Sequence, residues 1–264
     1  MKYLNAYSGL VVLFIWIMIS LFPNVYNLNG KTQELGEDLG NGPSYAIISA
    51  AVFILLVTVF SKNTIVTGLI FKNFQNLKIL NLQILVILMI VAFLVYHFDL
   101  ISMKSVVWTF FNCLFVGISE EMMFRGVLLS YFTKSWGFRK AAIAVIIIFG
   151  LVHILNALIT GELGLGVLQA FMAMCSGILF LAYRVNNLTI VFAILLHAIW
   201  DFLVFQLSYT LKLVNGEENM ILNLILSLLL FISPIVFGIY GLYHLKGKKI
   251  IEDYLVSQKL NFQE

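Results

Sequence analysis

Charged residues are scarce in this sequence. Asp, Glu, Lys and Arg make up 11% of its 264 residues, less than half of the roughly 25% that is usual in soluble globular domains. Hydrophobic residues reach 61%, and the mean hydropathy is +1.00. A water-soluble domain is therefore excluded, and the composition predicts an integral membrane protein. The net charge is +3, but the basic residues are scattered among the loops, so we expect no nucleic-acid partner.

Cysteines and internal repeats are also lacking. The two cysteines, Cys113 and Cys175, both lie in apolar runs, which indicates packing residues and not a disulfide or a metal-ligand pair. No segments broken by Gly or Pro occupy matching positions in two halves of the chain, as they do in many secondary transporters. A transporter or proton path is therefore a weaker alternative, although it stays open. No linker divides the chain, so we expect one domain over residues 1–264.

Long apolar runs divide the chain into membrane spans. A spanning helix needs roughly 20 mostly apolar residues. The first run, which follows Lys2, lacks a small-x-small cleavage site and is interpreted as a membrane helix and not as a signal peptide. The fold class that we predict is an all-α membrane protein of about eight transmembrane helices. They cover residues 7–26, 44–61, 79–97, 105–132, 141–159, 165–183, 188–209 and 221–243.

The loop charges indicate the orientation of these helices. One side of the predicted topology carries Lys2, Lys62, Lys72, Lys78, Lys134, Arg139, Lys140, Arg184, Lys246, Lys248, Lys249 and Lys259. The other side carries only Lys31, Lys104 and Lys212. Because Lys and Arg accumulate in cytoplasmic loops, both termini are expected in the cytoplasm.

Six ionisable residues remain inside the predicted helices. They are Glu120, Glu121, Arg125, His153, His197 and Asp201. Each costs ~2.5–3.5 kcal/mol at a helix centre, so together they require mutual pairing or a water-filled cavity. The charges that flank three of the helices place their midpoints near residues 119, 151 and 198, within two residues of Glu120, His153 and His197. We therefore predict a polar cavity near the middle of the membrane.

Helical spacing predicts which of these side chains cooperate, because residues three or four apart share a face. Glu121 and Arg125 are four apart and are expected to form an internal ion pair, which leaves Glu120 free to face the cavity. His197 and Asp201 are also four apart.

The same spacing groups Phe149 with His153, and Asn156 follows His153 by three residues as an additional hydrogen-bonding group. Gly117 and Ser119, just before the two glutamates, could allow a bend or bulge that re-aims Glu120.

This set of side chains is suited to hydrolysis in two ways. A carboxylate and an imidazole that converge on one water can make it nucleophilic, and a second histidine can stabilise the developing oxyanion. Alternatively, Glu120, His153 and His197 could hold a zinc ion that activates the water, with Asp201 and Asn156 as outer partners. The residues alone leave both possibilities open.

Several intramembrane protease signatures are missing. The chain has no His-Glu-x-x-His metal motif. Ser176-Gly177 follows Met174-Cys175 and so lacks the Gly-x-Ser-Gly element of rhomboid-like enzymes. Asp201 is the only aspartate within a predicted helix, so the paired aspartates of presenilin-like enzymes are absent.

Three motifs in residues 105–206 resemble the CPBP family of intramembrane endopeptidases. This family comprises the CAAX proteases, which trim prenylated proteins, and bacterial Abi and bacteriocin-processing relatives. The motifs are Glu-Glu-x-x-x-Arg (Glu120, Glu121 and Arg125), Phe-x-x-x-His (Phe149 and His153) and His-x-x-x-Asn, where Asp201 replaces the Asn that follows His197. Residues 1–100 and 221–264 contribute further transmembrane helices and, after the last of them, a cytoplasmic tail.

The resemblance implies that Glu120 and His153 activate water and that His197 and residue 201 stabilise the oxyanion. Because a carboxylate donates no hydrogen bond unless it is protonated, Asp201 is expected to orient His197 or to bind a cation. The resemblance leaves zinc open.

The expected function is cleavage of a membrane-associated protein or hydrophobic peptide precursor near the cytoplasmic half of a bacterial cell membrane, in contact with lipid. The alternative is a non-catalytic membrane scaffold, such as an immunity or sensor-regulating protein that keeps the same fold.

Overall fold

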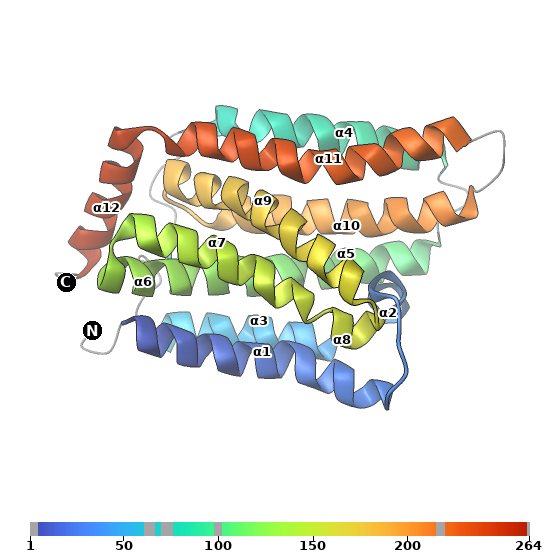
Figure 1. The fold of residues 1–264 in the computed structure, drawn as a ribbon, viewed down its shortest axis with the longest axis horizontal. Coiled ribbons are helices and arrows are strands. Elements are labelled where there is room, and N and C mark those ends of the chain that lie inside the picture. Colours follow the sequence, from blue (N-terminus) through green and yellow to red (C-terminus); the bar gives the residue numbers. More distant parts are fainter. Residues whose placement is uncertain (1–4, 61–66, 70–75, 98–101, 215–219, 263–264) are drawn as a thin grey trace.

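The computed structural model describes residues 5–60, 67–69, 76–97, 102–214 and 220–262, and the regular secondary structure of these residues is entirely helical. Figure 1 shows the helices side by side in one elongated bundle. Their bounds are α1 Ala6–Leu28, α2 Leu35–Asn41, α3 Tyr45–Phe60, η1 Leu77–Leu80, α4 Asn81–Tyr96, α5 Met103–Glu121, η3 Met122–Leu128, α6 Leu129–Trp136, α7 Phe138–Ile154, α8 Ala157–Thr160, α9 Leu163–Asn187, α10 Val191–Leu213, α11 Met220–Leu245 and α12 Lys248–Phe262.

The predicted spans correspond to helices of the bundle. Seven segments of the described chain are long and apolar enough to cross a membrane: Ala6–Leu28, Leu77–Tyr96, Met103–Trp136, Phe138–Thr160, Leu163–Asn187, Val191–Leu213 and Asn223–Leu245. The eighth prediction, 44–61, corresponds to α3, an apolar helix of 16 residues; residue 61 lies outside the described residues. The prediction of an all-α membrane protein with about eight helices is thus confirmed.

Both termini lie at the same end of the bundle, as an even number of crossings requires (Figure 1). We call this the terminal end, and the opposite end, where α2 and α8 lie, the distal end. The basic residues near the terminal end are Lys78, Lys134, Arg139, Lys140, Arg184, Lys246, Lys248, Lys249 and Lys259, whereas Lys31, Lys104 and Lys212 lie at the distal end. Lys2, Lys62 and Lys72 lie outside the described residues.

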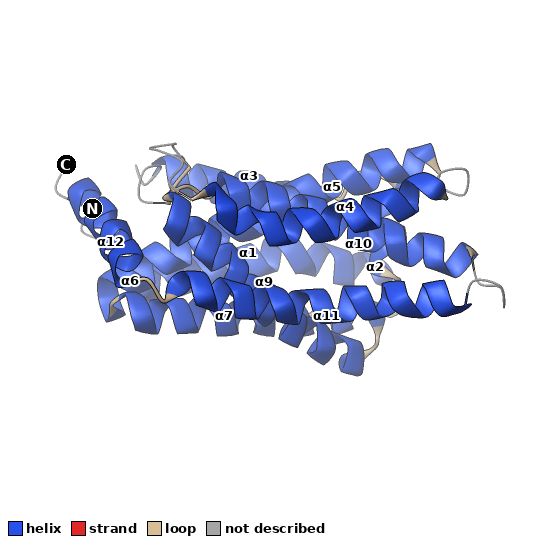
Figure 2. Ribbon diagram, turned by 90° about the horizontal axis from the view of Figure 1, so that it is seen from above, coloured by secondary structure: helices blue, strands red, loops and turns tan. Residues whose placement is uncertain are grey.

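Two short helices at the ends of the bundle were not predicted as such. The chain between α1 and α3 contains α2, which packs on α5 and α10 at the distal end. The tail expected after residue 243 forms α12, which lies across the terminal end (Figures 1 and 2). Tyr254 of α12 is fully buried, with its ring 5.2 Å from the guanidinium carbon of Arg184. Because Tyr254 is buried, α12 is a packed element of the fold, and the same burial raises the pKa of the Tyr254 hydroxyl.

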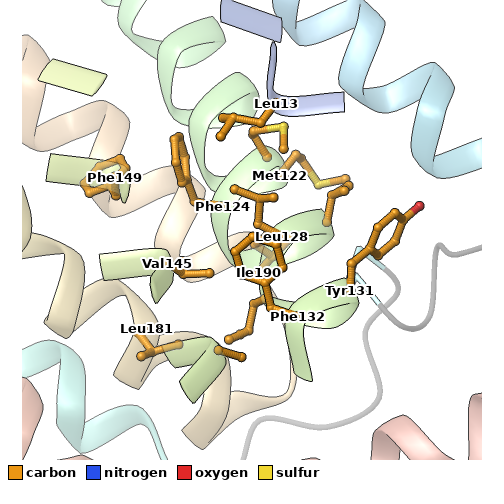
Figure 3. Packing of buried hydrophobic residues seen from close by; sticks show 14 of the residues in the cluster. Leu13, Met122, Phe124, Leu128, Tyr131, Phe132, Val145, Phe149, Leu181 and Ile190 are labelled. Carbon is orange, nitrogen blue, oxygen red and sulfur yellow. The ribbon is translucent and has the colours of Figure 1, made fainter. Parts of the chain in front are cut away.

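A hydrophobic cluster fills the bundle on the terminal side of Glu120. Met122, Phe124 and Leu128 of the segment that continues α5 are fully buried. They belong to one cluster with Phe132, Val145, Leu181 and Ile190, which come from four other stretches of helix or loop (Figure 3). Because a close-packed interior has few voids larger than a water molecule, this cluster closes the bundle beneath the polar residues.

Candidate active site

A cavity of about 320 Å³ lies between the helices at the level of the buried polar residues. Helices α1, α5, α7, α9 and α10 supply most of its wall, with contributions from α2, α3, α8 and α11. Most of the lining is apolar. The polar and ionisable side chains that face the cavity are Ser20, Asn24, Ser119, Glu120, His153, Asn156, Gln169, Ser176, His197 and Asp201.

Glu120 lies at the centre of this polar group. Its Oε2 atom is 3.9 Å from Nε2 of His153 and 3.8 Å from Nε2 of His197. The predicted convergence of three helices at one level is therefore present. Oε2 is buried and has no hydrogen-bond partner among the described residues. A buried carboxylate oxygen without a partner is costly, so this atom is available to a water molecule or a substrate in the cavity.

His153 is held in one tautomer by its own helix. Its Nδ1 atom lies 2.7 Å from the carbonyl oxygen of Phe149, one helical turn earlier. Since a carbonyl oxygen can only accept, Nδ1 carries the ring hydrogen, and Nε2 of a neutral ring is left as an acceptor that faces Glu120. The four-residue spacing between Phe149 and His153 thus fixes the orientation of the imidazole as well as the face on which it lies.

Glu121 contacts two partners at once. One carboxylate oxygen, Oε1, accepts from Arg125 at 2.9 Å and from Nδ1 of His197 at 2.8 Å. The ion pair predicted from spacing is confirmed, but the contact with His197 across two helices was not predicted. Since a carboxylate accepts only, Nδ1 of His197 carries a hydrogen, and its Nε2 is directed into the cavity. Asp201 follows on the same helix, with Oδ2 3.3 Å from that Nε2.

Arg125 is enclosed on all sides. The side chain is fully buried, its guanidinium carbon lies 4.0 Å from the ring centre of Phe149, and it donates to the carbonyl oxygen of Gly177 at 3.1 Å. A Cβ atom at Gly177 would stand 2.8 Å from the guanidinium, so glycine is required there for Arg125 to reach α9. Phe149 separates this charge from the cavity, and Arg125 supports Glu121 without lining the cavity itself.

The helix is irregular after the two glutamates, whereas the sequence predicted a bend or bulge before them. Gly117 and Ser119 lie in regular α-helix, whereas residues 122–128 form the π-helical segment η3. The prediction of a bend before Glu120 was therefore wrong. Gly117 has another role, because a Cβ atom there would lie 2.7 Å from the carbonyl oxygen of Ile194. Because glycine has no Cβ atom, α5 can approach α10 closely enough for the glutamates to reach His197.

Asn156 and its partner line the distal side of the cavity. The amide of Asn156 donates to Oε1 of Gln169 at 3.2 Å, which joins α8 to α9. Gln169 and Asn24 were not singled out from the sequence, because their predicted spans contain no ionisable residue to which helical spacing could relate them. Extending the search for ionisable residues to Asn and Gln in apolar segments would have found both.

The donor set does not form a preformed zinc site. Ligands of a tetrahedral zinc ion lie about 3.3 Å from one another, given metal–ligand distances of ~2.0–2.1 Å. The separations of Glu120 from the two histidines, 3.9 and 3.8 Å, are wider. Across the described residues, no group of three or more His, Cys, Asp or Glu side chains is arranged to hold a metal ion. The mechanism proposed below therefore uses only the side chains of the cavity.

Comparisons with known proteins gave one family match. No curated protein and no solved structure matches the chain. The family model of the type II CAAX prenyl endopeptidase Rce1-like proteins matches residues 102–203, nearly the range of 105–206 over which the three motifs were found. The match confirms the resemblance to CAAX proteases and identifies residues 102–203 as an Rce1-like region within a helical membrane protein.

Proposed function

We propose that this protein is an intramembrane endopeptidase of the CAAX-protease and Abi type. It would hydrolyse a peptide bond in a membrane-associated protein or hydrophobic peptide. One observation supports the proposal most strongly: the unpartnered Oε2 of Glu120 faces Nε2 of both His153 and His197 in a single cavity. Glu121 also has a buried oxygen without a partner among the described residues, but Glu120, unlike Glu121, lines the cavity.

Water activation follows from the two acceptors at the cavity floor. Oε2 of Glu120 and Nε2 of His153 are 3.9 Å apart, too far for a direct hydrogen bond but close enough for both to accept from one water. With its two hydrogens so held, the water presents a lone pair to the scissile carbonyl carbon. Glu120 takes one proton as the new carbon–oxygen bond forms, which gives a tetrahedral intermediate.

His197 is suited to stabilise the oxyanion of that intermediate. Its two ring nitrogens contact the carboxylates of Glu121 and Asp201, which favour the doubly protonated imidazolium, and only that form carries a hydrogen on Nε2. This hydrogen can be donated to the former carbonyl oxygen in a site that excludes bulk water. Asp201 contacts the same Nε2 and acts as a positioning residue in place of the family's Asn. Glu120 then returns its proton to the amide nitrogen as the carbon–nitrogen bond breaks, which releases a carboxyl and an amine product.

The proposal includes hydrolysis without a bound metal, since the donor atoms are too widely spaced for a preformed zinc site. We expect protein purified without added metal to contain far less than one zinc per chain by elemental analysis. We also expect it to keep its activity after dialysis against a strong chelator. One zinc per chain that is lost in His153→Ala, together with activity restored by zinc alone, would overturn this part of the mechanism.

Hydrolysis itself is tested by isotope incorporation. Membranes that contain the protein are incubated in water enriched in ¹⁸O, and the peptides released are compared with those from membranes with His153→Gln. A peptidase predicts fragments whose new carboxyl terminus carries one ¹⁸O atom and which are missing from the variant. The rival function, a non-catalytic scaffold, predicts identical peptides from both membranes and a regulatory phenotype that survives loss of His153.

A further inference from the structure

From the level of Glu120 and the two histidines, the cavity extends toward the distal end of the bundle. In α1 its lining begins at Trp16 and extends to Asn24, four residues before the helix ends at Leu28. In α10 it runs from His197 toward the distal terminus as far as Phe205, and in α9 it occupies residues 169–180, the middle of that helix. Glu120, His153 and His197 therefore form the inner end of the cavity, which we call its floor, and the remaining lining extends from them toward the distal end.

The other direction is closed. Met122, Phe124 and Leu128, which follow the glutamates toward the terminal end, are fully buried in the hydrophobic cluster (Figure 3). Phe149, also fully buried, covers the Arg125 guanidinium on the same side. A substrate that approached from the terminal end would have to displace this packed core. On the distal side the lining includes Ile159 of α8 and Leu35 and Leu39 of the short helix α2, and we call this side the mouth of the cavity.

The charge distribution assigns a side of the membrane to that mouth. Basic residues gather at the terminal end, and of the three at the distal end Lys212 forms an ion pair with Glu34. By the positive-inside rule the terminal end is cytoplasmic. The sequence led us to expect both cytoplasmic termini and cleavage near the cytoplasmic half of the membrane. In this fold the cavity extends from mid-bundle away from the termini, so cytoplasmic termini favour an opening toward the other face.

The lining of the mouth indicates what enters it. Asn24, Asn156 and Gln169 offer amide groups that can pair with the backbone of an extended peptide, between walls that are otherwise apolar. None of the described residues that line the cavity is Lys or Arg, whereas Glu120 and Asp201 are acidic. An acidic side chain next to the scissile bond would find no counter-charge.

We propose that the active site is loaded from the non-cytoplasmic face of the membrane. Its substrate would be an apolar peptide segment, free of acidic residues at the scissile bond, that has already crossed the membrane or emerges on its outer side. This inference rests on the proposed peptidase function for the identity of the occupant, but the side of access does not depend on activity.

The side of access is tested by thiol labelling in intact cells. In a background with Cys113→Ala and Cys175→Ala, single cysteines are introduced as Asn24→Cys at the mouth, Glu162→Cys on the exposed distal surface and Lys248→Cys on α12. A membrane-impermeant maleimide should label Asn24→Cys and Glu162→Cys to the same extent with and without permeabilisation. Lys248→Cys should be labelled only after permeabilisation.

The other outcomes overturn the proposal. If Asn24→Cys is labelled only from the cytoplasmic side, or in neither condition while Glu162→Cys reacts, the mouth does not open outward. If Lys248→Cys reacts in intact cells and Glu162→Cys does not, the orientation is reversed. Failure of the peptidase function looks different: outward labelling at Asn24→Cys would persist, while no ¹⁸O-labelled fragment would appear. The two proposals therefore fail separately.

Discussion

Glu120→Gln is expected to lower kcat/KM for peptide hydrolysis by roughly 10²–10⁴-fold, the usual contribution of a general base, while the protein stays folded. Glutamine keeps the shape of the side chain but cannot take a proton from the water between residues 120 and 153. The carboxylate oxygen that is lost has no hydrogen-bond partner among the described residues, so its replacement breaks no bond within the fold. We expect kcat to fall more than KM rises, because the proton moves only in the transition state.

The measurement compares initial rates on a peptide identified by the isotope experiment, with the protein in lipid vesicles. Glu252→Gln is the matched control, because it makes the same chemical change on an exposed side chain of α12. It should leave both the rate and the thermal stability unchanged. Full activity in Glu120→Gln would remove the assigned base. A lower melting temperature in that variant would instead mean that Glu120 stabilises the fold.

The parts of this site that could be predicted from sequence are those set by one helix. Ionisable residues stand out in apolar runs, and a spacing of four residues correctly paired Glu121 with Arg125 and His197 with Asp201. Flanking charges placed Glu120, His153 and His197 at one depth. These are local properties of an α-helix with 3.6 residues per turn, and they need no knowledge of the neighbouring helices.

Contacts between helices could not be predicted in the same way. The bond from His197 to Glu121 depends on how α10 is rotated and how closely it approaches α5, which is set by packing at Gly117. Spacing along one helix gave Glu121 a single partner, Arg125, and could not indicate its second partner, His197. The position of η3 and the side on which the cavity opens also depend on the packed bundle. Glycines within apolar spans were the available signal, since small residues mark close helix contacts.

Arg125→Met is expected to destabilise the protein by about 3–5 kcal/mol, the usual result of removing one partner of a buried ion pair. Methionine fills much of the same space but leaves the buried Glu121 carboxylate with His197 as its one hydrogen-bond partner among the side chains that the structure describes. It also leaves the carbonyl oxygen of Gly177 without the guanidinium donor. Because Glu121 orients His197, activity should fall together with stability, even at temperatures at which the variant is folded.

A double-mutant cycle separates charge from packing in this effect. The free energy of unfolding is measured by detergent titration for Arg125→Met, Glu121→Gln and the double variant, in which no buried charge remains unpaired at these two positions. The double variant should be more stable than Arg125→Met, because the penalty arises from an uncompensated carboxylate. Arg139→Met, the same substitution at an exposed position, should change little. If Arg125→Met costs no more than this control, the buried pair does not support the site, and another contact must orient His197.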